Sequence, residues 1–271
     1  TTDRVRATDT VSGATAEIAV QVNRDPTAGF VAEWGSSDVW FVDTGRKTGG
    51  HAFATDFHAA LAVAGLRQAE STSREGTRAD RLAETCVRLS MLRHLSRFFL
   101  RGADGSRANG LPISFPWAEP VGYVKPGAGG WMAGGAGRYS VISIVHGSQP
   151  GILGTAYTDG ASNGNHENDT STPQAGELGV FANRFVETVN RAYNNLALVQ
   201  APLVDDDAAV LADLLHGRPT THVRAPLLRN AIEALGRSIA TVTAHEIGHS
   251  LGLAHTETYV PGALMNSAAV L

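Results

Sequence analysis

The sequence predicts an α+β fold, in which a mixed, twisted β-sheet packs on a long helix and extra helices surround it. The strongest strand signal is YSVISIV at residues 139–145, an apolar run rich in β-branched side chains. Residues 80–100 instead carry apolar side chains near helical spacing, behind an aspartate suited to a helix N-terminus. A helical pattern also leads into the histidine-rich stretch at residues 245–255.

Shorter segments supply the other elements. Strands are predicted at residues 15–22, 37–42, 152–157 and 177–181, and helices from Asp56 to about residue 69 and at 183–198, 208–216 and 226–235. We expect Gly236 to break the last helix and Ser238 to start the next one. The aspartates at 205–207 are expected to cap their helix. The glycine-rich residues 127–137 lack the ending of a nucleotide-binding loop and predict a loop or hairpin tip.

Composition and charge limit the partners. The 271 residues can bury one large core or two modest ones, and the 43% hydrophobic content is ordinary for a globular protein. A net charge of −4 gives no basic footprint, so we expect neither nucleic acid nor a membrane as a partner. No run of eighteen apolar residues suggests a transmembrane helix. The oligomeric state stays open.

The stretch HEIGHSLGLAH at residues 245–255 carries the chemistry. His245 and His249 lie one helical turn apart and can hold one metal ion together. Glu246 is rotated away from that pair but can reach a water on the metal, and Gly252 can end the helix so that His255 turns back. Three neutral imidazoles and one open position are what a catalytic zinc requires. The alternative is a solvated helix with incidental histidines.

This stretch resembles the metzincin clan of zinc endopeptidases, whose motif His-Glu-x-x-His-x-x-Gly-x-x-His precedes a methionine turn. Residues 262–266, GALMN, are similar to that turn, and the combination looks most like the matrixins, the matrix-metalloproteinase-type family. The close match spans residues 239–267. The resemblance implies a metzincin-like fold, peptide-bond hydrolysis by metal-activated water with Glu246 as general base, and a floor of Met265 beneath the histidines.

The matrixin resemblance also implies a substrate-binding strand. Matrixins have a segment similar to ILGTAY, residues 152–157, at the sheet edge above the cleft. By this resemblance the backbones of Gly154, Thr155 and Ala156 would pair with an extended protein or peptide substrate. An ordinary interior strand is the alternative.

A second metal site is a weaker implication of the same resemblance. Matrixins bind structural calcium and a second zinc in the loop that matches residues 159–170, where His166, Glu167 and Asp169 are candidate ligands. A solvated loop is the alternative, because the spacing fits neither the matrixin motif nor an EF-hand.

The sequence departs from the family in two places. Ser267 stands where astacins and serralysins have a metal-binding tyrosine, and the spacing of Tyr259 does not assign it that role. The sequence stops at Leu271, whereas matrixins continue into a further helix. We therefore expect the pocket wall beside the zinc to be incomplete or supplied by another part of the chain. The helical stretch at 183–235 is longer than the matrixin pattern and is interpreted as an insertion.

Cysteine usage and the first residues bear on the compartment. Cys86 is the single cysteine, so no intramolecular disulfide can form, and its surroundings lack the latency motif of matrixin zymogens. We expect it to be a buried apolar residue. The resemblance implies a secreted enzyme. Since the segment beginning at Thr1 lacks the apolar core of a signal peptide, any such signal has been removed.

Two other functions remain open. The chain could be a catalytically silent zinc-binding interaction module, or a metal-dependent hydrolase of a non-peptide amide. The presence of Glu246 favours an enzyme, because metal binding alone needs only the histidines. For domain organisation, residues 1–101 are predicted to form an N-terminal α/β region and residues 102–271 the catalytic region, with one continuous domain as the alternative.

Overall fold

The computed structural model describes most of the central part of the chain. The described residues are 2–8, 15–21, 38–100, 111, 113–121, 131–133, 139–158, 164–168, 177–184, 186, 202–255 and 265, with backbone alone for 2–8, 15–21, 100, 131–133 and 164–167. The named helices are α1 (Asp56–Val63), α2 (Arg78–Leu100), α4 (Asp207–Leu215) and α5 (Ala225–Ser250). The strands are β1 (Thr2–Thr8), β2 (Thr15–Gln21), β3 (Asp38–Asp43), β4 (Ile113–Ser114), β5 (Trp131–Ala133), β6 (Ser140–Val145), β7 (Gly154–Thr155), β8 (Gly164–Asn168) and β9 (Gly179–Phe181).

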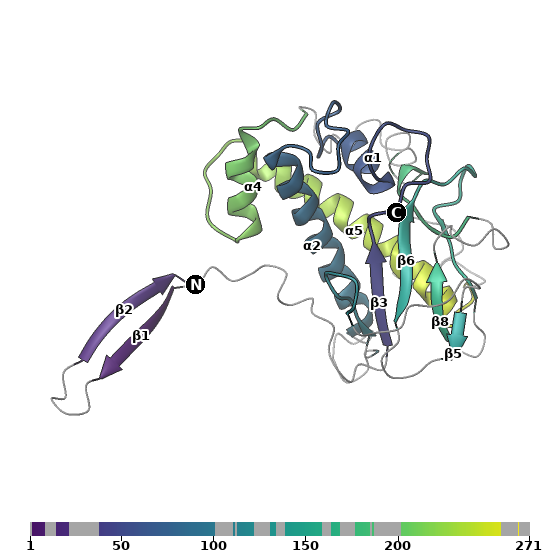
Figure 1. The fold of residues 1–271 in the computed structure, drawn as a ribbon, viewed down its shortest axis with the longest axis horizontal. Coiled ribbons are helices and arrows are strands. Elements are labelled where there is room, and N and C mark those ends of the chain that lie inside the picture. Colours follow the sequence, from purple (N-terminus) through teal and green to yellow (C-terminus); the bar gives the residue numbers. More distant parts are fainter. Residues whose placement is uncertain are drawn as a thin grey trace.

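A seven-stranded mixed sheet forms one layer of the fold, in the order β4-β3-β6-β8-β5 with β9 also paired to β6. Strand β3 runs parallel to β4 and β6, and β6 also runs parallel to β8 and β9. Strand β5 is antiparallel to β8, and β7 is antiparallel to β9. The predicted α+β class and mixed sheet are therefore confirmed. Strands β1 and β2 pair with each other in a separate antiparallel hairpin (Figure 1).

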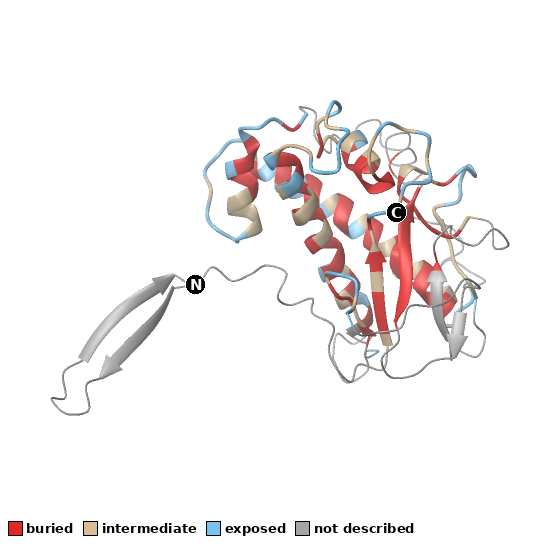
Figure 2. Ribbon diagram, viewed as in Figure 1, coloured by how far each residue is buried: buried red, intermediate tan, exposed pale blue. Residues whose placement is uncertain are grey.

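The core lies between this sheet and the long helices. Strand β6 is buried along its whole length, as its apolar sequence predicts (Figure 2). Helix α5 passes along the sheet, and α2 packs beside α5 (Figure 1). One hydrophobic cluster joins the layers, and its buried members include Trp40, Phe57, Leu95, Ile144, Leu235 and Ile247. The histidine-rich segment that starts at His245 is thus the last part of a helix anchored in the core.

Helix α5 runs unbroken for 26 residues, so the expected break at Gly236 is wrong. A Cβ atom added at Gly236 would lie 2.6 Å from the Cβ of Ser90 and 3.0 Å from the amide nitrogen of Met91. The glycine therefore allows close approach of α2 and α5. Tertiary packing at this contact offsets the low helix propensity of glycine.

The helix starts differ in detail from the prediction. In α2, Thr77 is the capping residue: its hydroxyl accepts a bond from the Asp80 amide at 3.2 Å, and the Asp80 carboxylate accepts one from the Thr77 amide at 2.8 Å. This is a reciprocal capping box, with Asp80 at its third helical position. Helix α1 is capped by Thr55 instead of Asp56, and it ends at Val63 instead of residue 69.

Two predicted loops contain strands. Strand β8 lies within the predicted loop 159–170, and β5 lies within residues 127–137, where a loop or hairpin tip was expected. Both errors have one physical reason, because β5 and β8 pair with each other across a long sequence separation that local pattern does not reveal.

The predicted helix at 208–216 is confirmed as α4, but one of the aspartates expected to cap it has another partner. The buried Asp207 carboxylate forms an ion pair with Arg224 at 2.7 Å, and it also accepts a bond from the Val204 amide. For the helix predicted at 183–198, residues 183, 184 and 186 are helical and the rest lies outside the described residues.

The division at residue 101 stays a prediction. Strand β3, which precedes it, pairs with β6, which follows it. Among the helices that the structure describes, none combines the length and apolar character needed to cross a membrane.

Candidate metal centre

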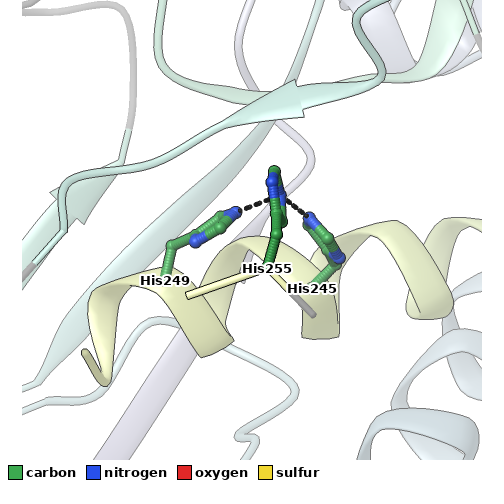
Figure 3. A group of neighbouring side chains, drawn as sticks. All are labelled: His245, His249 and His255. Atoms are coloured by element: carbon green, nitrogen blue, oxygen red, sulfur yellow. Dashed lines mark hydrogen bonds between the residues drawn. The ribbon is translucent and has the colours of Figure 1, made fainter. Parts of the chain in front are cut away.

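Three imidazoles meet at the C-terminal end of α5 (Figure 3). His245 and His249 project from the same face of the helix, with ring centroids 4.8 Å apart. The helix ends at Ser250, and Gly252 adopts a φ of 84°, which a residue with a side chain adopts only with strain. His255 turns back to place its Nε2 atom 3.1 Å from Nε2 of His245 and 3.0 Å from Nε2 of His249. Gly252 thus has the predicted position and conformation.

The spacing of these nitrogens fits a zinc ion. A tetrahedral zinc with Zn–N bonds of about 2.05 Å holds its nitrogen ligands roughly 3.3 Å apart. The potential ligand atoms of the three residues all lie within 4.8 Å of one another. Within the described ranges, no other group of histidine, cysteine or acidic side chains has this geometry.

A backbone contact prepares His249 to bind a metal. Its Nδ1 atom lies 3.0 Å from the carbonyl oxygen of Leu253, which can only accept, so Nδ1 carries the proton and Nε2 presents its lone pair. Burial lowers the pKa of His249, and the nearby His255 adds to that effect, although the bond to Leu253 opposes it. A pKa below the ordinary value keeps this ring neutral at pH 7, as a metal ligand must be.

Met265 lies directly against the turn of α5 that separates His245 from His249. Its side chain is buried, and a Cβ atom added at Gly248 would collide with the Met265 Sδ atom. Gly248 therefore makes room for the thioether. The sequence interpretation passed over this glycine, although its place between the two helical histidines was visible in the motif.

Glu246 is buried beside the triad, with 5% of its surface exposed. Burial raises the pKa of its carboxyl to about 8. A bound dication nearby would favour the carboxylate form and lower that pKa. Glu246 contributes no atom to the cluster of metal-ligand candidates.

Strand β7 lies against Glu246. A Cβ atom at Gly154 would come within 2.6 Å of the Glu246 Oε1 atom, so the strand backbone passes close to the carboxylate. Gly154 pairs with Val180 and Thr155 pairs with Gly179, both in β9. In the described part of the sheet β9 is the sole partner of β7, which places β7 at an edge. The strand is shorter than the predicted 152–157, and Ala156 follows it.

Two further side chains join this region, and sequence reasoning missed both. Asn168 at the end of β8 and Ser250 at the end of α5 are buried and hydrogen-bonded to each other at 2.9 Å. Both also bind the backbone of Tyr157, which follows β7. A lone asparagine or serine gives no sequence signal for such a contact.

Other candidates remain untested or have a structural role. His166 and Glu167 lie in β8, where the backbone alone is described, and Asp169, Tyr259 and Ser267 fall outside the described residues. Cys86 is buried, as expected, with Sγ 3.8 Å from the Leu211 carbonyl oxygen. Burial raises the pKa of its thiol to about 12, so it stays protonated at neutral pH.

This motif and its converging Nε2 atoms define a zinc metallopeptidase of the metzincin type. Residues 145–270 match the family Peptidase_M10, Matrixin, and the match covers the segment from the end of β6 through Met265. Residues 145–270 therefore carry a matrixin domain, a domain of a metzincin zinc metallopeptidase family, as the sequence predicted. No curated protein and no solved structure matches the chain.

Proposed function

We propose that the protein is a zinc-dependent endopeptidase that cleaves peptide bonds within proteins. The observation that carries this proposal is the meeting of three elements at one place: the histidine triad, the buried Glu246 carboxylate and the edge strand β7. A zinc held by His245, His249 and His255 would keep a coordination position open for water or substrate.

The substrate would bind as an added strand. The backbone groups of Gly154, Thr155 and Ala156 that face away from β9 would pair with an extended peptide. Since Gly154 lies next to Glu246, a peptide on this edge would pass close to the carboxylate. Backbone pairing accepts many sequences, which suits an enzyme that acts on proteins.

Glu246 would act as the general base and then as the general acid. Bound zinc supplies Lewis-acid polarisation of a water molecule and of the scissile carbonyl group. The Glu246 carboxylate takes a proton from the attacking water and afterwards delivers it to the departing amine nitrogen. The Met265 side chain supports the helical turn beneath the histidines and excludes water there.

The resemblance to matrixins extends the proposal to the compartment and to calcium. We expect the enzyme to act outside the cell, where matrixins typically work. We also expect calcium to bind near residues 166–169 and to raise the melting temperature of the purified protein. Equal melting curves with calcium and with a calcium-selective chelator would reject the calcium proposal.

Metal analysis combined with a peptide digest tests the main proposal. Purified protein should contain about one zinc per chain, and internal peptide bonds of casein should be cut in a manner that a chelator stops and zinc restores. Glu246→Gln should retain zinc but lose cleavage, whereas His255→Ala should lose both. Zinc without cleavage would indicate a silent binding module. Cleavage of acylated small molecules without cleavage of peptides would indicate an amide hydrolase.

A further inference from the structure

Three hydrogen bonds form a closed ring beside the metal-binding helix. The Tyr157 amide donates to Asn168 Oδ1, the Asn168 Nδ2 group donates to Ser250 Oγ, and the Ser250 hydroxyl donates to the Tyr157 carbonyl oxygen. Each of the three donor–acceptor distances is 2.9 Å. The two side chains are 0% and 1% exposed, so water does not compete for these bonds.

This ring joins three distant parts of the chain. Asn168 ends the parallel strand β8, and Ser250 is the last residue of α5, directly after His249. Tyr157 lies two residues beyond the end of β7. The ring thus links the strand proposed to bind substrate to the helix that carries two of the three histidines.

The ring of hydrogen bonds fixes the chain just beyond the point where β7 stops pairing with β9. Strand β7 pairs with β9 over Gly154 and Thr155, and the Leu153 carbonyl oxygen accepts one further bond from the Phe181 amide at 2.8 Å. Such a short pairing holds the position of the strand only weakly by itself. Two residues later, side chains satisfy both backbone groups of Tyr157, in place of a neighbouring strand. The segment from Gly154 to Tyr157 is therefore fixed at both ends, by pairing with β9 at Gly154 and by the Asn168 and Ser250 side chains at Tyr157.

We propose that Asn168 and Ser250 are positioning residues, which fix the distance between the substrate-binding edge and the metal centre. The inference rests on the proposed peptidase function and assigns these residues no contact with substrate. A peptide paired to β7 can place its scissile carbonyl group at the metal centre only if the distance between β7 and α5 stays fixed. A shift of about 1 Å in such an arrangement can lower the reaction rate a hundredfold.

Two variants break the ring, and one variant is a matched control. Ser250→Ala removes the hydroxyl group and with it two of the three bonds. Asn168→Asp keeps the acceptor for the Tyr157 amide and loses the donor to Ser250, and it also places a carboxyl group at a fully buried position. Thr243→Val is the control: Thr243 is also 0% exposed in α5, but its hydroxyl donates within the helix, to the Ile239 carbonyl oxygen.

The measurement compares two inhibitors on the zinc-loaded proteins. Acetohydroxamate engages the metal alone, whereas a peptide hydroxamate of about six residues engages both the metal and the β7 edge. We expect Ser250→Ala to weaken the peptide hydroxamate by about tenfold or more and to lower kcat/KM for a peptide of that length. Zinc content and acetohydroxamate affinity should match the parent. Asn168→Asp should also weaken the peptide hydroxamate, and Thr243→Val should bind both inhibitors like the parent.

Amide hydrogen exchange supplies a readout that needs no activity. The segment 153–158 should exchange at least about tenfold faster in Ser250→Ala than in Thr243→Val. Unchanged exchange in this segment would overturn the proposed role of the ring. Faster exchange with unchanged affinity for the peptide hydroxamate would overturn it too, since the ring would then be structural only. If the parent binds zinc but cleaves no peptide, the proposed function fails, while exchange still decides whether the ring holds β7.

Discussion

The Met265 thioether packs against Gly248, in the helical turn between His245 and His249. Because the contact leaves no space for a Cβ atom, Gly248→Ala must displace either the methionine or the helix. Overpacking of this kind typically costs about 1–3 kcal/mol. We expect zinc affinity to fall by about tenfold, measured by competition with a chromophoric chelator. Gly50→Ala is the control, since a Cβ atom there meets open space, and equal zinc affinity in the two variants would contradict the prediction.

Gly154→Ala should reduce turnover without loss of zinc. The new methyl group would lie 2.6 Å from the Glu246 Oε1 atom, so the carboxylate or the strand must move. We expect kcat/KM to fall by about tenfold or more on a peptide substrate, with unchanged metal content. A double-mutant cycle on stability locates the cause: the substitution should destabilise the protein less when Glu246 is replaced by Ala. Equal destabilisation in both backgrounds would show that the clash is elsewhere.

Gly236→Ala should destabilise the protein, although helix propensity alone predicts a gain of about 1 kcal/mol. The added Cβ atom would overlap Ser90 of α2, where the two long helices touch. We expect the free energy of unfolding to fall by about 1–3 kcal/mol in denaturant titrations. Replacing Ser90 by Gly should recover part of this loss in the double variant. A rise in stability for Gly236→Ala alone would refute the close contact.

Stability should depend on the Asp80 carboxylate in acid. Burial alone would raise the pKa of Asp80, but hydrogen bonds from Ser71, Gln68 and Thr77 outweigh it and hold the pKa below 3.8, its ordinary value. The unfolded chain therefore binds a proton more readily than the folded one. The stabilisation is complete above the ordinary pKa and is lost as pH falls through the lower, folded pKa.

Asp80→Asn tests this dependence. At neutral pH the free energy of unfolding of the variant should be about 1–2 kcal/mol lower than that of the parent, because part of the α2 capping box is lost. Between about pH 4 and pH 2 the parent should lose stability more steeply, so that the two curves approach each other. Asp56, whose pKa is also lowered, contributes the same slope to both proteins. Parallel curves over this range would contradict the assignment.

The meeting of the three histidines was predictable because its geometry is local. Helix periodicity alone places His245 and His249 on one face, and a glycine alone permits the turn that returns His255. The unbroken course of α5 through Gly236 was not predictable, since its cause is Ser90, more than a hundred residues away in the sequence. The pairing of β5 with β8 was not predictable either, because the two strands are also far apart in the sequence.

The surroundings of the centre were less accessible to sequence reasoning. The motif suggested a catalytic glutamate and the family resemblance suggested an edge strand, but neither indicated that Gly154 lies on the Glu246 carboxylate. The Asn168–Ser250 bond joins residues that are 82 positions apart and carry no motif. Contacts of this kind arise from packing between elements that are distant in the sequence. The periodicity of a single sequence indicates helices and strands but does not indicate which side chains of different elements will touch.

Helix α5 is secured by apolar contacts from Leu228 to Ile247, independently of anything bound at its end. Only His255 depends on the turn beyond the helix. We therefore expect the chain to fold without the metal ion and to bind it afterwards. Removal of the ion should abolish activity while the circular dichroism spectrum stays native. The rate at which activity returns should then depend on the supply of metal and not on refolding.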